Sequence, residues 1–182
     1  MPKLNDQTVS PLDIFQQLEN DSLGNQLTDA EAVAGEVWRG FVFNVDGLDL
    51  AVPFLGEFGI VPNQEMFAVP MASSWVKGMT NVRGEIYTVV DFSEFIGRKP
   101  VRMTKGCNLL LLPDSGLKSA LLLDGRISLR TFSFDLPLAS NDLFYSKLSP
   151  YLSRVVVDGD KQWGVLDVEA LCGSRKFSQI GQ

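Results

Sequence analysis

An Asp-Gly pair between two alternating apolar segments constrains the fold of this chain more than any other feature. Residues 38–45 and 48–54 alternate apolar and polar side chains, and Asp46-Gly47 separates them. An Asp-Gly pair readily takes the positive φ angles that a two-residue β-hairpin turn requires. The sequence therefore predicts an antiparallel hairpin here, followed by a body built from strands rather than long helices.

Short apolar segments recur along the rest of the chain, with Gly, Pro, Asn or Asp between them. Asp158-Gly159-Asp160 marks a further hairpin turn. Strands this short, with this much turn punctuation, are typical of small closed or partly closed β-barrels. Brief helices are expected at residues 73–76, 92–96 and 168–172. The candidate strands are residues 38–45, 48–54, 57–61, 67–69, 85–92, 108–112, 119–123, 127–132, 152–157 and 162–166.

The number of candidate strands leaves two arrangements open. A single barrel is one of them, and two five-stranded halves fit the strands better. The polar segment at residues 97–106, which begins with Gly97-Arg98-Lys99-Pro100, is the natural midpoint of two such halves. No internal sequence repeat supports the division.

The net charge of −6 lies entirely in the first part of the chain. Residues 1–37 hold one lysine and seven carboxylates, whereas the 15 basic and 15 acidic residues that follow cancel. Because phosphate binding needs clustered Lys and Arg, the neutral body argues against nucleic-acid binding. We therefore expect an acidic N-terminal extension that is separate from the folded body.

The extension contains one apolar patch. Leu12, Phe15 and Leu18 recur at helical spacing, and Pro11 suits the first turn of a helix. Two interpretations stay open for it. Either the patch belongs to a flexible acidic arm whose short helix binds a partner, or the segment packs on its own body or is a disordered lead.

Composition and motifs exclude several classes of catalytic and metal site. The chain has no histidine, which removes histidine-dependent triads and histidine-ligated zinc sites. Its two cysteines, Cys107 and Cys172, form no CxxC pair, so neither a thiolate metal cage nor a disulfide framework is indicated. Glycine-rich nucleotide motifs and the GxSxG nucleophile elbow are absent as well. We therefore expect no metal ion, no cofactor and no histidine-, cysteine- or GxSxG-based catalysis, whereas these absences leave a carboxylate-based enzyme open.

The start of the chain shows no basic region followed by a long apolar run, as a secretory signal would. No apolar run approaches the ~20 residues of a membrane span. We therefore expect a cytoplasmic protein without direct membrane insertion.

Residues 69–91 form the most informative segment. Asn81 can close a turn on its local backbone, and Gly84 permits backbone geometry that other residues resist. Arg83 lies between them with a planar head that offers five hydrogen-bond donors. An apolar strand follows and ends at Asp91.

The run Asn81-Val82-Arg83-Gly84, followed by an apolar strand and Asp91-Phe92, resembles the hallmark of CheW-like domains, the coupling proteins of bacterial chemosensory arrays. Residues 41–53, 120–124 and 151–171 resemble the opening strand pair, the acidic strand end of the second half and the closing hairpin of that family. The resemblance covers about residues 37–175.

The resemblance implies a mainly β fold of two intertwined, SH3-like, five-stranded β-barrels with short helices. On this basis residues 1–36 are an acidic N-terminal extension, residues 37–177 the CheW-like domain and residues 178–182 a tail.

The resemblance also implies a non-catalytic adaptor. Such a protein bridges the cytoplasmic tip of a methyl-accepting chemoreceptor and the regulatory domain of a CheA-like histidine kinase, within membrane-bound receptor arrays. The long acidic extension, and Arg154 where the family commonly has glycine, make the chain most similar to the PilI group of type IV pilus twitching systems. Open alternatives are a CheW for flagellar chemotaxis, an array linker, and an unrelated small-barrel binding protein or enzyme.

For the receptor-binding groove, the matched motif implies Asn81, Arg83 and Gly84, and a looser match adds Glu57 and Phe58. Arg83 has two open roles, because it either pairs with a receptor carboxylate or amide or braces loop carbonyls. The kinase-facing residues stay unnamed. The candidates for a partner-binding arm are Leu12, Phe15 and Leu18.

Overall fold

The computed structural model describes residues 36–54, 58–113, 118–140 and 147–178. Glu57 and the arm candidates Leu12, Phe15 and Leu18 lie outside the described residues, as does nearly all of the expected N-terminal extension and tail. The proposed boundaries of these two segments therefore stay predictions.

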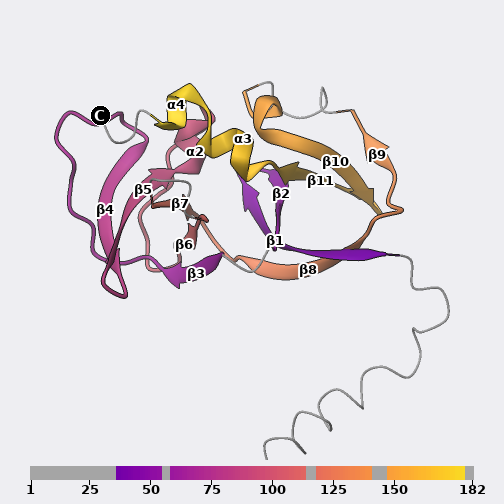
Figure 1. Ribbon diagram of the computed structural model, residues 1–182, viewed down its shortest axis with the longest axis horizontal. Helices are drawn as coiled ribbons and strands as arrows, with labels where there is room; N and C mark the ends of the chain where they lie inside the picture. The colour runs from indigo at the N-terminus through magenta and orange to yellow at the C-terminus, as the bar shows by residue number, and fades with distance from the viewer. Residues whose placement is uncertain (1–35, 55–57, 114–117, 141–146, 179–182) are drawn as a thin grey trace, which may run out of the picture. The chain divides into compact units, whose positions relative to one another are not determined.

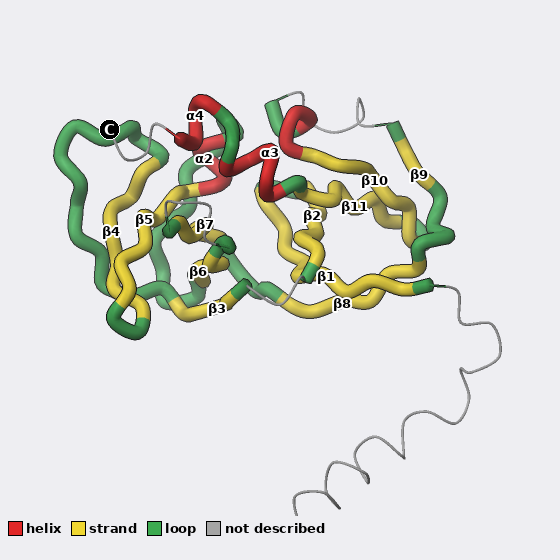
Figure 2. The backbone as a smooth tube through the Cα atoms, in the orientation of Figure 1, coloured by secondary structure: helices red, strands yellow, loops and turns green. Residues whose placement is uncertain are grey.

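The described chain folds into two β-sheets with short helices between and after their strands (Figures 1 and 2). The first sheet contains β1 (Val37–Val45), β2 (Leu48–Pro53), β8 (Ser128–Ser133), β9 (Leu138–Ala139), β10 (Leu152–Asp158) and β11 (Lys161–Leu166). The second contains β3 (Gly59–Pro62), β4 (Val76–Val82), β5 (Glu85–Asp91), β6 (Asn108–Leu111) and β7 (Ser119–Leu123). The helices are α2 (Phe92–Phe95), η2 (Ser149–Tyr151), α3 (Val168–Cys172) and α4 (Arg175–Ser178).

The two sheets are interleaved along the chain. The strand order is β8-β1-β2-β11-β10-β9 in the first sheet and β3-β6-β7-β5-β4 in the second. The chain leaves the first sheet after β2, builds the whole second sheet, and returns at β8. The mainly β, two-part architecture is confirmed, with the two-residue β9 as a sixth strand of the first sheet. The expected midpoint at residues 97–106 instead lies inside the second sheet, between α2 and β6.

Most of the predicted strands and two of the predicted helices are present. The first hairpin pairs Val45 with Leu48 across Asp46-Gly47, whose φ angles are 48° and 87°. The helices expected at residues 92–96 and 168–172 are α2 and α3.

The helix expected at residues 73–76 is wrong, because β4 begins at Val76. β4 escaped notice since Lys77, Thr80 and Asn81 interrupt its apolar alternation. The segment expected as a strand at residues 67–69 contributes a single bridge, between Phe67 and Met79.

Each sheet contains the same strand–cap–helix unit, which the sequence did not reveal as a repeat. β5 ends at Asp91, whose side chain accepts a hydrogen bond from the Glu94 amide at 3.0 Å and caps α2. β11 ends just before Asp167, whose side chain accepts from the Ala170 amide at 2.8 Å and caps α3. In both units the central strand pairs in parallel with a distant strand, β7 or β2. An Asp at this position supplies the acceptor that a helix N-terminus needs.

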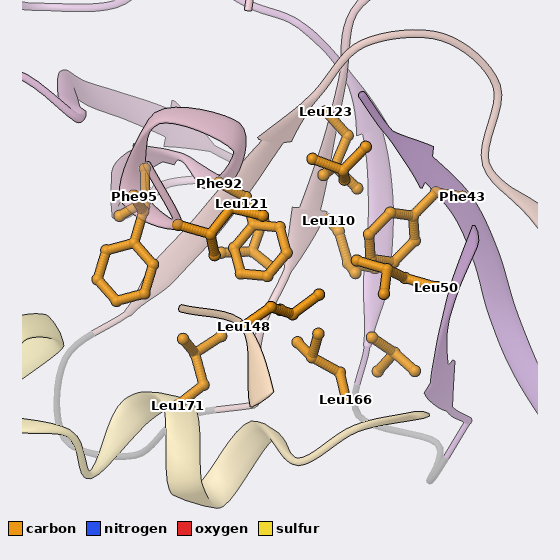
Figure 3. Packing of buried hydrophobic residues seen from close by; sticks show 14 of the residues in the cluster. Phe43, Leu50, Phe92, Phe95, Leu110, Leu121, Leu123, Leu148, Leu166 and Leu171 are labelled. Atoms are coloured by element: carbon orange, nitrogen blue, oxygen red, sulfur yellow. The ribbon is translucent and has the colours of Figure 1, made fainter. Parts of the chain in front are cut away.

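Three clusters of buried apolar side chains hold the sheets together. The largest draws on both sheets, and Figure 3 shows Phe43 and Leu50 of the first facing Leu110 of the second. Each smaller cluster belongs to one sheet, as expected for two barrels with their own interiors. Full burial of one such side chain contributes about 1.5–3 kcal/mol. The smaller clusters are Trp38, Val42, Ala51, Phe132, Val156, Trp163 and Val165, and Val61, Val82, Val89, Cys107, Leu109, Ala120 and Leu122.

We expect Gly78→Ala to lower the free energy of unfolding by about 2 kcal/mol, because its backbone is strained for any other residue. Gly78 has a φ of 144°, and an added Cβ would lie 2.4 Å from the carbonyl oxygen of Phe67. That oxygen accepts the Met79 amide at 2.8 Å, so relief of the clash also weakens the bridge beside β4.

Chemical denaturation measures this loss, and Gly125→Ala is the matched control. Gly125 also has a positive φ, of 83°, but an added Cβ there meets no atom within 4 Å. Equal losses in the two variants would show that the close approach to Phe67 contributes nothing.

Candidate functional site

The turn between β4 and β5 is built by the Asn-Val-Arg-Gly motif. Arg83 and Gly84 are its two central residues, with φ angles of 53° and 88°, and Val82 pairs with Glu85 across it. Two consecutive positive φ angles define the turn type whose twist matches that of a hairpin. Asn81 secures the turn, because its Oδ1 accepts the Gly84 amide at 2.8 Å. Asn81 and Gly84 therefore shape the hairpin tip.

This hairpin tip closes one side of a surface hollow, here called the hairpin concavity. The other side is formed by the segment that leads into and along β3. The structure thus brings Phe58 and Arg83 together, although they are 25 positions apart in the sequence. The lining residues are Phe58, Gly59, Ile60, Val61, Val82, Arg83, Glu85, Tyr87 and Leu111.

The Arg83 side chain is exposed at the rim of the hairpin concavity. Among the described residues its guanidinium makes no hydrogen bond, ion pair or ring contact. Bracing of the turn falls to Asn81 rather than to Arg83. A fixed cation with five available donors in a hollow suits a carboxylate or an amide oxygen of a partner.

Glu85 and Tyr87 of the same hairpin form a polar cluster with Lys118 that the sequence did not point to. Lys118 Nζ donates to Oε1 of Glu85, and the Tyr87 hydroxyl donates to Oε2 of Glu85 at 3.0 Å. These two hydrogen bonds hold the pKa of Glu85 below its usual value of 4.5, and the bond from Lys118 has the larger effect. Glu85 is therefore ionised and already satisfied, which leaves Arg83 as the cation of the hollow available to a partner.

We expect a carbon-detected NMR titration to give Glu85 a pKa below 4.5, and Lys118→Met to raise it. Because the pKa is lowered in the folded chain, the stabilisation from this pair is present above the unfolded pKa. It is lost as the pH falls through the folded value. Tyr87→Phe should produce a smaller rise, since Tyr87 contributes less than Lys118. An unchanged Glu85 pKa in Lys118→Met would contradict this assignment.

An aromatic trio connects the hairpin concavity to the first sheet. The Phe41 ring on β1 lies edge-on to Phe54 at 5.2 Å between centroids and to Phe58 at 6.4 Å. Phe54 is 40% exposed and Ile60 is 37% exposed. Apolar surface therefore continues from the hairpin tip of the second sheet to the end of β2 in the first.

The structure assembles three of the predicted receptor-groove residues in one hairpin and adds Phe58 across the hollow. Sequence reasoning missed Tyr87, Lys118 and Phe54. Tyr87 lies on the same face of β5 as Glu85, so strand periodicity could have indicated it. Lys118 reaches the site through the parallel pairing of β5 with β7, for which no local signal exists.

Within the described segments, no group of three Cys, Asp or Glu side chains is placed to hold a metal ion. No described helix is long and apolar enough to cross a membrane. The side chains gathered at the hairpin concavity are mostly apolar or aromatic, with Arg83 and Glu85 as its charged members.

The described chain thus combines two sheets around a shared core with a largely apolar hollow beside one hairpin. The sequence model of the CheW-like domain matches residues 39–176, and the chain belongs to this family. CheW-like proteins are non-catalytic scaffold and coupling proteins, so the prediction that the chain is not an enzyme is confirmed.

Two known proteins illustrate the relationship. The chain is 24% identical over 152 residues to Protein PilI of Pseudomonas aeruginosa, covering 83% of this chain and 84% of that protein. The crystal structure of the scaffolding protein TtCheW from Thermoanaerobacter tengcongensis superposes with a TM-score of 0.66 at 14% sequence identity. It covers 78% of this chain and 96% of its own, which confirms the fold.

Proposed function

We propose that this chain is an adaptor that couples methyl-accepting chemoreceptors to a CheA-like histidine kinase and so controls type IV pilus twitching motility. Membership of the CheW-like family supports the coupling role. The observation that carries the assignment to pili is the similarity to Protein PilI, which extends over most of both chains. A CheW for flagellar chemotaxis and an array linker are the alternatives that the experiments below separate.

The physical task of such an adaptor is to link two binding events. Receptor state biases kinase activity only if both partners contact the adaptor at distinct surfaces and differ in free energy between signalling states. Each contact can be weak, because an array multiplies it through many simultaneous contacts.

We assign the receptor tip to the hairpin concavity. The aromatic trio, which includes Phe58, offers apolar surface, and Arg83 beside it offers a guanidinium that has no partner among the described residues. A helical receptor tip with aliphatic side chains and one carboxylate or amide would match this combination. Glu57 and the arm residues Leu12, Phe15 and Leu18 stay candidates from sequence alone.

This function places the chain at the cytoplasmic face of the membrane, held in the receptor array by its partners. No cofactor or metal ion takes part, because coupling needs only binding surfaces.

Titration calorimetry with the full chain tests the proposal. We expect saturable, one-to-one binding to the regulatory domain of the neighbouring kinase and separate binding to a receptor-tip fragment. Binding to both partners at once in a pull-down establishes bridging. If the chain failed to bind the kinase domain, or failed to bind the receptor-tip fragment, at high micromolar concentration, the adaptor role would be overturned.

Deletion of the gene separates the pilus from the flagellar role. We expect the loss of twitching motility on a surface with swimming intact. The opposite pattern would assign the chain to flagellar chemotaxis, and loss of neither would favour an array linker.

A further inference from the structure

Arg154 on β10 occupies an unusual environment at the first sheet. Its guanidinium carbon lies 5.2 Å from the ring centre of Trp38 and 5.5 Å from that of Phe134. The Nε atom is buried and has no hydrogen-bond partner within the described part of the chain. Two aromatic rings thus fix the position of a cation that no carboxylate of the described residues neutralises.

A second arginine in the same cluster shows the satisfied form of this arrangement. Arg130 lies over the rings of Phe132 and Trp163, at 5.6 and 5.2 Å, and also pairs with Asp158. Arg130 therefore has both ring contacts and a carboxylate, whereas Arg154 has the ring contacts alone. Because the Nε atom of Arg154 is buried, only the terminal nitrogens of its guanidinium can meet a further acceptor, and among the described residues no carboxylate reaches them.

Large apolar side chains stand exposed on the strand ends around Arg154. Phe134, one of its two ring contacts, is 50% exposed, and Leu138 on β9 is 68% exposed. β9 pairs with β10 through Leu138 and Val156, two positions from Arg154. An unpaired cation bordered by exposed apolar groups is the composition of a protein-binding surface rather than of a small-molecule site.

We propose that Arg154 determines partner specificity at a second contact surface, where it receives a carboxylate of the kinase regulatory domain that is flanked by apolar side chains. This inference rests on the proposed function, because it names the partner of the second surface that a bridging adaptor requires. A carboxylate complements the positive charge of Arg154. Apolar side chains beside that carboxylate would pack against the exposed Phe134 and Leu138.

The kinase rather than the receptor is assigned here because the hairpin concavity, already assigned to the receptor tip, is built by the second sheet. Arg154, Phe134 and Leu138 belong to the first sheet and to the segment between two of its strands. The aromatic trio extends the receptor surface only to β1 and the end of β2, whereas Arg154 and Leu138 lie on β10 and β9. We therefore expect the two surfaces to bind their partners at the same time.

The test compares binding of the kinase regulatory domain to the full chain and to three variants by calorimetry, between about 0.05 M and 0.5 M salt. Arg154→Met keeps the apolar stem on Trp38 and removes the charge. Leu138→Ser removes exposed apolar surface at a position that the fold does not bury. Arg102→Met is the control for the charge change, because Arg102 is an exposed arginine in the loop before β6.

We expect Arg154→Met to weaken kinase binding about tenfold or more and to flatten its salt dependence. Leu138→Ser should weaken it with the salt dependence unchanged, and Arg102→Met should bind as the original chain does. Receptor-tip binding should stay the same in Arg154→Met, and thermal unfolding should change only by the small amount that the loss of two ring contacts explains. This result separates a contact from a structural role.

Three outcomes would overturn the inference. Kinase binding by Arg154→Met with the original affinity and salt dependence would refute it while the adaptor function stands. Loss of both kinase and receptor binding in Arg154→Met would show a structural role instead. Absence of kinase binding by the unaltered chain would overturn the proposed function, and the assignment of Arg154 would fall with it.

Discussion

Asp91→Ala is expected to lower the free energy of unfolding by about 3–4 kcal/mol, a large part of the stability of an ordinary domain. The Asp91 side chain is completely buried. One carboxylate oxygen accepts the Glu94 amide at 3.0 Å, and the other accepts the Val101 amide at 2.8 Å. The second oxygen also lies 3.5 Å from Lys77 Nζ. Alanine would leave two backbone donors unsatisfied, each at about 1–3 kcal/mol.

Asp167→Ala is the control that the fold provides for this prediction. Asp167 caps α3 as Asp91 caps α2, but it is only partly buried and makes the cap bond alone among the described residues. Removal of an exposed helix cap costs about 1 kcal/mol. Guanidinium denaturation of both variants measures the difference. Equal losses would show that the bonds to Val101 and Lys77 add nothing to the cap.

The several bonds of Asp91 also explain why an Asp stands at the end of β5, the strand that follows the Asn-Val-Arg-Gly turn. Asp91 ties β5, α2 and the loop at Val101 to one carboxylate, and so fixes the strand that carries Tyr87 and Glu85 into the hairpin concavity. Asp91→Ala would therefore disturb the hairpin concavity by destabilising β5, although Asp91 does not line the hollow.

The local parts of the fold could be predicted from sequence. Asp46-Gly47 predicted the first hairpin because this dipeptide suits positive φ angles wherever it occurs. α2 and α3 were predicted from the residues after two strand ends, where Asp91 and Asp167 cap them. β4 was missed because Lys77, Thr80 and Asn81 interrupt its apolar alternation, and its position depends on pairing with β5.

The interleaving of the two sheets could not be predicted from local signals. β11 pairs with β2, and β5 pairs with β7, in parallel across long stretches of chain. Parallel pairing requires a crossover and carries no turn signature at the paired residues. The polar loop at residues 97–106 therefore resembled a boundary, although α2 before it and β6 after it belong to the same unit of the fold.

The candidate site divides in the same way. Asn81, Arg83 and Gly84 form one short motif, and the sequence placed them in a turn for the reasons that the structure shows. Lys118 and the Phe41 ring arrive from other strands, and only the folded chain brings them to Glu85 and Phe58. When several strands contribute to a surface, sequence reasoning can predict only the part that one short motif forms, here the Asn-Val-Arg-Gly turn.

Arg83→Glu is expected to weaken binding of the receptor-tip fragment about tenfold or more, with kinase binding unchanged. The substitution reverses the one available charge of the hairpin concavity and places a carboxylate in the hollow that already holds Glu85. Calorimetry with each partner measures both affinities. The fold should be unaffected, because the Arg83 side chain is exposed and the turn is secured by Asn81.

Two further variants decide whether the effect belongs to the site. Arg102→Glu makes the same charge change in an exposed arginine that lines a different hollow, so it should leave receptor binding unaltered. Phe58→Ala should weaken receptor binding about tenfold without any change in charge, because it removes the ring that lines the hollow and contacts Phe41 of the first sheet. If Arg83→Glu and Phe58→Ala both bind the receptor tip as the original chain does, the hairpin concavity is not the receptor site. The adaptor would then contact the receptor through another surface, even with bridging demonstrated. A loss with Phe58→Ala alone would instead assign the contact to the aromatic trio and leave Arg83 outside it.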